Sequence, residues 1–289
     1  MSGTRNLYLV FAIAAGLFVY AACHQWGSAT AEAIQEKLGP HLFVSLQRDC
    51  VEFSVEVRAA DSIPGSSPSI KSTNSRLSFE QTAQKYGTDK VTTHKYQFMY
   101  DKYLSGIREE EIKVLEIGLG CNMNYGPGAS YYTWLEYLPF VDLYFIEYDA
   151  QCAQKYQDKT ANARIFIGDQ ADPVFLTKFT AEATAGGLFD VIIDDGGHTM
   201  TQQITSLEYL WIAVKPGGLY VIEDLQTSYW ETFGGDPAGR RSSKETTMTY
   251  MFQLIDDLMI GRSEKKISHE ILSIDCMAEI CALRKKGDM

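Results

Sequence analysis

The chain has 289 residues, of which 45% are hydrophobic and 22% charged, and its formal net charge is −11. This length allows one large domain or two small ones with an ample core, and the composition excludes wholesale disorder. An acidic chain is poorly suited to a phosphate backbone, so nucleic acid is excluded as a partner. The six cysteines are scattered and form no C-x-x-C pair, which argues against zinc and leaves their pairing open.

An uncharged apolar run, Leu7–Ala22, follows Arg5 near the start of the chain. As a helix it spans about 24 Å, slightly less than a bilayer core of about 30 Å. A signal-anchor helix or a cleaved signal peptide would place the following chain beyond a membrane, and a buried soluble helix is the third interpretation. We therefore expect a single-pass membrane protein whose main domain is lumenal or extracellular, with secretion after cleavage as the alternative.

Composition divides the chain into four segments. A short tail (1–6) precedes the apolar segment (7–22), a stem and linker follow (23–75), and the largest domain takes up 76–289. The linker is inferred from Asp61–Ser75, which is rich in serine, proline and glycine.

From Ser78 onward, helical and strand-like patterns alternate. Stretches such as "SFEQTAQKYG", "ASYYTWLEYL" and "TQQITSLEYLWIAV" predict helices. Between the helices come apolar runs at 113–120, 141–149, 163–169, 189–195 and 217–225. The alternation predicts an α/β fold, with a doubly wound, mostly parallel sheet and helices on both faces, preceded by the N-terminal apolar helix. "EILSIDCMAEICALRKK" predicts two closing strands around a turn, which we expect to be antiparallel.

Acidic side chains follow all five predicted parallel strands. They are Glu116 in the first, Glu147 and Asp149 in the second, Asp169 in the third, Asp194 and Asp195 in the fourth, and Glu223 and Asp224 in the fifth. Parallel strands end at one edge of a sheet, and ligands bind at that edge. A single aspartate is ordinary in a turn, whereas acids after five successive strands favour a functional site.

The first of these loops, "EIGLG", contains two glycines, Gly118 and Gly120, that allow close approach of a ligand to the backbone. The full G-x-G-x-x-G pattern is absent, because Met123 stands at the third position. Glu147 can accept hydrogen bonds from both hydroxyls of a ribose. Glu116 would repel a pyrophosphate, so a nucleoside with a cationic centre, such as S-adenosylmethionine, fits this edge better.

The ordered motifs "VLEIGLG", "YFIEYD", "FIGDQ", "DVIIDDGGH" and "KPGGLYVIEDL" resemble class I S-adenosylmethionine-dependent methyltransferases, which have a Rossmann-like fold. The last two, together with "YGTDK" and "TSYW", more narrowly resemble metal-dependent sugar O-methyltransferases of the mycinamicin and macrocin type. The resemblance covers roughly Phe79 to Lys285. It implies methyl transfer to a hydroxyl of a small molecule, first a sugar-like or polyketide-like diol and second a phenolic diol.

The same resemblance implies roles for individual residues. The Mg²⁺ ligands would be Asp195, Glu223 and Asp224, and the base would be His198. The residues that bind S-adenosylmethionine would be Glu116, Gly118, Gly120, Glu147, Asp169, Gln170 and Asp194. One check is independent of the resemblance: Glu223 follows Asp195 by 28 positions, enough for one crossover helix between adjacent strands.

Each of these residues also has a purely structural interpretation. His198 can serve a turn, Asp194 and Asp195 can cap the next helix, and Glu223 and Asp224 can form a solvated strand end. The two glycines before His198 are expected to let the turn bend tightly. A hydroxylase-like relative with the same fold and a non-catalytic, membrane-anchored nucleoside-binding protein are the alternative functions. Oligomerisation is left open.

Three further motifs have open roles. "TSYW" at 227–230 is either a wall over the acceptor site or ordinary core. "GTDK" is either a simple turn or a loop that closes over the cofactor, with Lys90 offering a charge. Tyr96, Tyr100 and Tyr103 recur at helical spacing and are assigned to packing.

Overall fold

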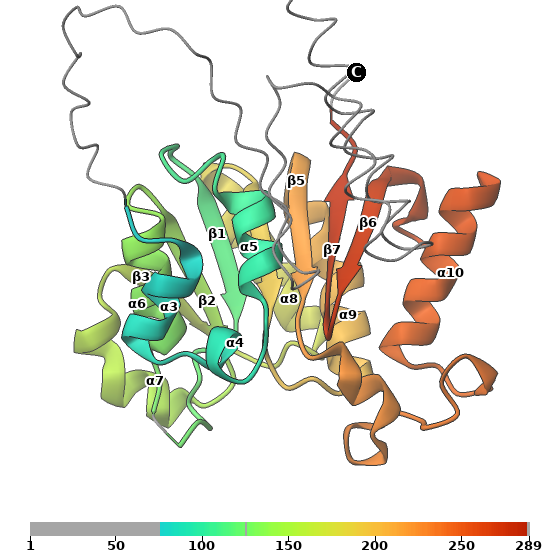
Figure 1. Cartoon of the computed structure of the whole chain (residues 1–289), viewed down its shortest axis with the longest axis horizontal. Helices are drawn as coiled ribbons and strands as arrows, with labels where there is room; N and C mark the ends of the chain where they lie inside the picture. The colour runs from blue at the N-terminus through green and yellow to red at the C-terminus, as the bar shows by residue number, and fades with distance from the viewer. Residues whose placement is uncertain (1–75, 125, 288–289) are drawn as a thin grey trace, which may run out of the picture. The chain divides into compact units, whose positions relative to one another are not determined.

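The structure, a computed structural model, describes residues 76–124 and 126–287, which belong to the unit Thr73–Met289 (Figure 1). The expected tail, apolar helix and stem (1–75) lie outside the described residues. The division of the chain into four segments therefore stays a prediction, and the described unit is treated by itself.

A seven-stranded sheet with the order β3-β2-β1-β4-β5-β7-β6 forms the centre of this unit. The strands are β1 Lys113–Ile117, β2 Asp142–Glu147, β3 Ala163–Ile167, β4 Phe189–Asp194, β5 Val214–Ile222, β6 Ile271–Met277 and β7 Ile280–Lys285. The first five pair in parallel, and β7 is antiparallel to both β5 and β6. The mostly parallel sheet and the antiparallel closing pair are confirmed.

Eight α-helices are described in residues 76–124 and 126–287. They are α3 Phe79–Tyr86, α4 Asp89–Thr92, α5 Gln97–Leu104, α6 Ala129–Tyr137, α7 Ala150–Tyr156, α8 Pro173–Ala183, α9 Met200–Leu210 and α10 Thr247–Ile260. The ends of α3 follow from its sequence. Ser78 forms a capping box with Gln81, and Gly87 ends the helix in the left-handed conformation with φ 73°.

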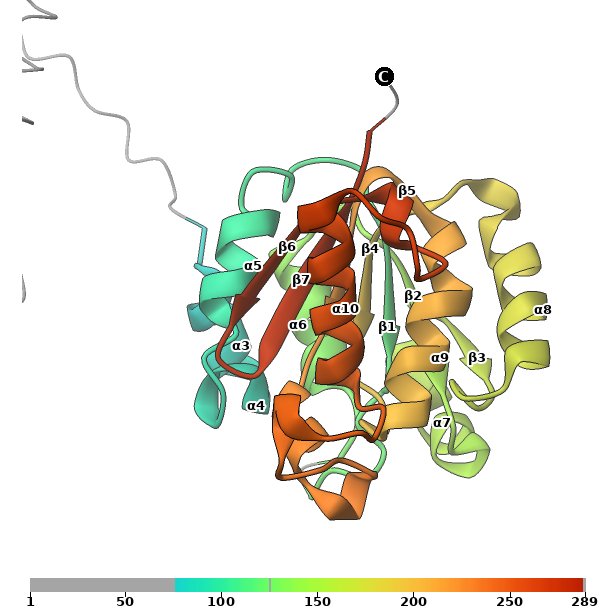
Figure 2. The ribbon, with the colours of Figure 1, turned by 90° about the vertical axis from the view of Figure 1, so that its right-hand side faces the viewer.

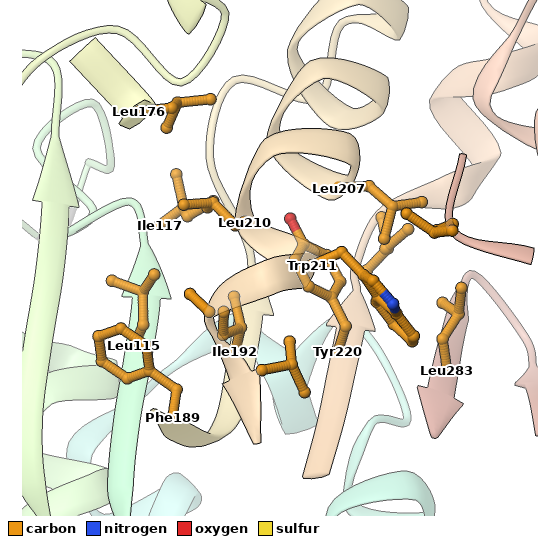
Figure 3. Close-up of a cluster of buried hydrophobic side chains, with 14 of the residues drawn as sticks. Leu115, Ile117, Leu176, Phe189, Ile192, Leu207, Leu210, Trp211, Tyr220 and Leu283 are labelled. Atoms are coloured by element: carbon orange, nitrogen blue, oxygen red, sulfur yellow. The ribbon is translucent and has the colours of Figure 1, made fainter. Parts of the chain in front are cut away.

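Side chains of the strands alternate between two hydrophobic clusters, one on each face of the sheet. Leu115 and Ile117 of β1 join the cluster packed by α8, α9 and α10, whereas Val114 joins the one packed by α3, α5 and α6. In Figure 1, α3 and α5 lie in front of the sheet and α8 and α9 behind it, and Figure 2 shows α9 and α10 from their own side. Leu207 and Leu210 cover the centre of the sheet in Figure 3. Burial of each such side chain contributes about 1.5–3 kcal/mol, so the central strands are held rigidly.

The strand order reverses between β1 and β4, and this reversal positions the site. The chain leaves β1 through α6 on one face and β4 through α9 on the other, so the two loops diverge. Ile117 pairs with Asp194, which in turn pairs with Ile222. The expected crossover helix between Asp195 and Glu223 is α9, and the strands that it joins are adjacent, as predicted.

Candidate active site

A cavity of about 380 Å³ opens where β1, β2, β3 and β4 end. Five residues of its wall are among those predicted to bind the cofactor: Gly118, Gly120, Glu147, Asp169 and Gln170. The same wall includes Asp195, His198 and Asp224. One hollow therefore joins the predicted nucleoside residues to the predicted base and two of the predicted metal ligands.

Two polar side chains of this wall are held in place by backbone groups. Glu147 Oε2 accepts a hydrogen bond from the amide of Leu119 (2.9 Å), and Oε1 accepts one from the amide of Asp149 (2.8 Å). Gln170 Oε1 accepts a hydrogen bond from the amide of Gly197 (2.8 Å). These bonds tie the loop after β1 to the end of β2, and the loop after β3 to the loop after β4, which helps to fix the shape of the cavity.

Two glycines of the wall are required by space. A Cβ on Gly118 would lie 2.2 Å from the Asp195 carbonyl oxygen, and one on Gly196 would lie 1.9 Å from Gln170 Oε1. The chain bends at Gly196, as expected for the two glycines before His198, although neither glycine has a left-handed backbone. His198 itself adopts that conformation, with φ 57°.

Two predicted cofactor residues, Glu116 and Asp194, lie beneath the cavity, outside the wall formed by the described residues. Both side chains are fully buried. Glu116 Oε2 accepts a hydrogen bond from Trp134 Nε1 (2.9 Å). Asp194 accepts hydrogen bonds from Gln170 Nε2 (2.9 Å) and from Ser206, and burial raises its pKa to about 6. Asp194 therefore faces the cavity only through Gln170, which it orients.

Asp195, His198 and Asp224 form the one described group of side chains whose arrangement can hold a metal ion. One ligand atom from each lies within 4.8 Å of the others. His198 Nε2 is 3.4 Å from Asp224 Oδ2, whereas His198 Nδ1 is buried without a hydrogen-bond partner among the described residues. Burial alone would raise the pKa of Asp224, but His198 and the Gln226 amide hold it below its ordinary value.

The backbone is strained at two members of this group. His198 and Asp224 are non-glycine residues with φ of 57° and 55°. Each such conformation costs about 1–3 kcal/mol and persists only where the surroundings enforce it. Here Thr227 Oγ1 donates hydrogen bonds to the carbonyl oxygens of both residues, at 3.0 Å and 2.7 Å. Strain at these two positions is typical of functional sites.

Lys90 lies at the centre of the acidic side chains, with 1% of its side chain exposed. Its Nζ is 2.6 Å from Asp195 Oδ2 and 2.7 Å from Glu223 Oε2. Glu116 Oε1 lies 3.1 Å away. Burial alone would lower the pKa of Lys90, but the carboxylates raise it well above its ordinary value. "GTDK" is therefore more than a simple turn, because its lysine is a buried counter-ion.

Glu223, the third predicted metal ligand, lies outside the group formed by Asp195, His198 and Asp224. Its Oε2 is bound by Lys90, and its Oε1 accepts a hydrogen bond from the hydroxyl of Tyr100. Asp195 and Glu223 converge on the ammonium of Lys90, and their predicted role as Mg²⁺ ligands stays a prediction.

The tyrosines assigned to packing also have polar roles. Tyr96 donates a hydrogen bond to Asp224 Oδ1 (3.0 Å), Tyr100 donates one to Glu223, and Tyr103 donates one to an aspartate of β6. Packing alone was therefore an incomplete interpretation of the stripe. The signal that could have revealed these bonds is that a buried tyrosine hydroxyl needs an acceptor.

Aromatic rings extend from His198 toward solvent. The ring of Phe233 lies 6.5 Å from that of His198 and 5.9 Å from that of Trp230. Tyr229 and Trp230 are 38% and 49% exposed, so the interpretation of "TSYW" as core is wrong for these two residues. Their exposure is compatible with a wall beside an acceptor.

The sequence of this chain is similar to those of known O-methyltransferases. A search of family models finds no match. The chain is 31% identical over 245 residues to L-olivosyl-oleandolide 3-O-methyltransferase of Streptomyces antibioticus. The matched region covers 81% of this chain and 61% of that protein. It is also 35% identical over 159 residues to mycinamicin VI 2''-O-methyltransferase of Micromonospora griseorubida. This match covers 54% of this chain and 38% of that protein. The chain is a homologue of macrolide-sugar O-methyltransferases.

A solved structure agrees with this relationship. This chain superposes on the MycE methyltransferase of the mycinamycin biosynthetic pathway, solved with Mg, SAH and mycinamycin VI. The TM-score is 0.66 and the sequences are 28% identical. The match covers 74% of this chain and 54% of MycE. The class I S-adenosylmethionine-dependent methyltransferase fold is thereby confirmed. This chain spans between 38% and 61% of the length of these curated relatives. Its activity is therefore proposed below.

The expected membrane localisation, with a lumenal or extracellular main domain or a secreted product, is wrong. The relatives are named as O-methyltransferases of small molecules such as demethylmacrocin, and MycE belongs to a biosynthetic pathway. In residues 76–124 and 126–287, no helix is both long and apolar enough to span a bilayer. Leu7–Ala22, on which the expectation rested, lies outside the described residues.

Proposed function

We propose that this protein is an S-adenosylmethionine-dependent O-methyltransferase that acts on a hydroxyl of a small molecule with the support of Mg²⁺. The acceptor we propose is a sugar-like or polyketide-like diol, in line with the names of the relatives. The observation that carries the proposal is the single cavity whose wall holds Glu147 and Gln170 together with Asp195, His198 and Asp224.

Glu147 is suited to a ribose. Each of its two oxygens accepts one backbone amide. A carboxylate has about four acceptor sites, so each oxygen keeps one for a ribose hydroxyl. Asp169 and Gln170, at the end of the next strand, would flank the adenine. The two amides that hold Glu147 remove the need to order it when the cofactor binds.

Asp195 and Asp224 are the residues that would hold Mg²⁺, because both offer oxygen ligands and both are partly accessible from the cavity. A nitrogen ligand suits this ion less well, which leaves His198 available as a base. Glu223 would join the ligands only if it exchanged its bond to Lys90 for one to the metal. Bound Mg²⁺ supplies a Lewis acid that lowers the pKa of an acceptor hydroxyl.

His198 would accept the proton of the acceptor hydroxyl. Nε2 is the nitrogen that performs this step, since Nδ1 is buried. The hydroxyl oxygen forms a bond to the methyl carbon as the bond from that carbon to the cofactor sulfur breaks. The products are a methyl ether, S-adenosylhomocysteine and a proton on His198. Asp224 Oδ2, 3.4 Å from Nε2, stabilises the resulting positive charge.

Titration calorimetry of the full chain with S-adenosylmethionine, with and without Mg²⁺, tests the proposal. Transfer of labelled methyl groups to a panel of glycosylated macrolides and phenolic diols then identifies the acceptor. Absence of cofactor binding under both conditions would overturn the methyltransferase. Binding and turnover that ignore Mg²⁺, together with full activity of Asp195→Ala, would remove only the metal.

His198→Asn is the sharpest substitution at this site. Asparagine tolerates the left-handed backbone, so the change removes the imidazole and leaves the turn intact. We expect kcat to fall by about 10²–10⁴-fold, the range for loss of a general base, with cofactor affinity unchanged. Steady-state kinetics and calorimetry measure the two quantities, and an unchanged kcat would show that His198 is not the base.

A further inference from the structure

A second histidine faces the other carboxylate oxygen of Asp224. His94 Nε2 lies 3.5 Å from Asp224 Oδ1, and His198 Nε2 lies 3.4 Å from Oδ2. The His94 ring stacks on Tyr96, with centroids 4.7 Å apart and planes 10° from parallel. The side chain of His94 is only 14% exposed, so its orientation is set by these neighbours.

The other nitrogen of His94 is held by a residue far away in the sequence. Nδ1 donates a hydrogen bond to Glu279 Oε2 at 2.7 Å. Glu279 lies in the turn between β6 and β7 and, like His198 and Asp224, has a left-handed backbone, with φ 67°. These three are the non-glycine residues with positive φ in the described part of the chain. His198 faces Asp224 directly, whereas Glu279 is linked to it through His94.

The turn that carries Glu279 is fixed in two ways. A disulfide joins Cys276 to Cys281 across the two strands, directly before and after the turn. The carbonyl oxygen of Glu279 accepts a hydrogen bond from the amide of Leu225 at 2.8 Å. Leu225 follows Asp224, so the turn is attached to the backbone of the site as well as to His94.

The two oxygens of Asp224 have different surroundings. Oδ1 accepts hydrogen bonds from Tyr96 (3.0 Å) and Gln226 (2.8 Å) and also faces His94. Oδ2 faces His198 and is the oxygen left for a cation. Because Oδ1 already has several hydrogen-bond partners, the carboxylate cannot rotate freely. Hydrogen-bond partners of a metal ligand usually affect how tightly the metal binds.

We propose that Glu279 and His94 form a positioning pair that fixes Asp224 so that Oδ2 is presented to a divalent cation beside His198. The inference rests on the proposed function, because it assigns partners to one of the two carboxylates proposed to hold Mg²⁺. It adds a residue from the closing hairpin to a site otherwise built from the parallel strand ends and the α4–α5 segment. A purely structural pair would stabilise the fold without affecting metal affinity.

Titration of the full chain with Mn²⁺, followed by electron paramagnetic resonance and calorimetry, tests the pair. We expect His94→Ala and Glu279→Ala to raise the Mn²⁺ dissociation constant by about 10- to 100-fold, the usual effect of losing such a partner. Glu279→Gln should restore most of the affinity, because its amide oxygen still accepts from Nδ1. Affinity for S-adenosylmethionine should not change in any variant.

His269→Ala is the matched control. His269 lies just before β6, its side chain is 59% exposed, and it faces Glu270 at 3.4 Å. The His269→Ala variant should bind Mn²⁺ with the same affinity as the parent chain. If His94→Ala fails to fold, the two Glu279 variants still decide the question, because that side chain is 40% exposed.

The outcomes separate this inference from the proposed function. A parent chain that binds no Mn²⁺ overturns both the metal and the positioning pair. A parent that binds Mn²⁺, with alanine variants of equal affinity, overturns the pair alone. Equal weakness of Glu279→Gln and Glu279→Ala also overturns it, since the hydrogen bond would then have no effect.

Discussion

At the scale of single residues, the chemistry of the site depends on how buried charges are compensated. Lys90 is completely enclosed and lies within 3.1 Å of carboxylates from three different strand ends. Charges of this kind are tolerated only when they are paired, since each loses its hydration on burial. The ammonium of Lys90 therefore allows Asp195 of the cavity wall to lie close to the buried carboxylates of Glu116 and Glu223.

Replacing Lys90 with methionine should reveal this compensation. The change leaves buried carboxylates without a counter-ion, so we expect the free energy of unfolding to fall by about 3–5 kcal/mol, as for other broken buried pairs. Urea denaturation measures the difference. Lys85→Met is the control, because Lys85 forms an ion pair with Glu136 at the surface and should change stability little. Equal effects of the two variants would contradict the role assigned to Lys90.

At the scale of elements, short polar contacts attach the closing segments to the sheet. Asp257 of α10 is buried, and its Oδ2 accepts hydrogen bonds from the amides of Glu264 (3.0 Å) and Lys265 (3.1 Å) and from Ser268 Oγ (2.5 Å). The carboxylate thus attaches α10 to the loop that leads into β6. The bond from Ser268, followed by that from Lys265, lowers the pKa of Asp257.

The lowered pKa of Asp257 predicts how the stability of the protein changes with pH. The unfolded chain has an ordinary aspartate with a pKa of about 3.9. A lowered pKa in the folded state means that the carboxylate contributes stability above that value and loses it as the pH falls through the folded pKa. Asp257→Asn should therefore lower the thermal midpoint at pH 7, and the difference should shrink toward pH 3. Calorimetry across this range measures it, with the exposed neighbour changed in Asp256→Asn as control. A difference that is independent of pH would contradict this assignment.

At the scale of the whole molecule, two disulfides restrict the part of the chain that the structure describes. Cys121–Cys152 links the loop after β1 to α7 and encloses α6 and β2, whereas Cys276–Cys281 closes only the hairpin turn. The sequence separations are 31 and 5 residues. Cys121 also contributes to the cavity wall, so the longer link attaches one side of the proposed cofactor site to α7.

Removal of each disulfide should affect stability unequally. A cross-link restricts the unfolded chain more when it closes a longer loop, which gives about 3–4 kcal/mol for 31 residues and about 2 kcal/mol for 5. We expect Cys121→Ser with Cys152→Ser to destabilise the protein more than Cys276→Ser with Cys281→Ser. Chemical denaturation of both double variants under non-reducing conditions measures the difference. The reverse order would show that local contacts outweigh chain entropy.

The sequence by itself determined the elements, the sheet and the edge at which the site lies. Periodicity of apolar residues marked the strands, and "DDGGH" and "VIEDL" placed Asp195, His198 and Asp224 at neighbouring strand ends, where the structure also has them. These features depend on short-range patterns and on the geometry of parallel strands, which the order of residues encodes directly.

Only the tertiary structure decided which side chains compensate the acidic residues. Lys90 reaches Glu223 across 133 positions, and His94 reaches Glu279 across 185, so no local pattern connects either pair. The same holds for the cysteine pairs and for the placement of Glu116 and Asp194 beneath the cavity wall. Such partners are selected by how α4, α5 and the closing hairpin pack against the sheet, because a buried charge binds whatever opposite charge the fold brings within reach.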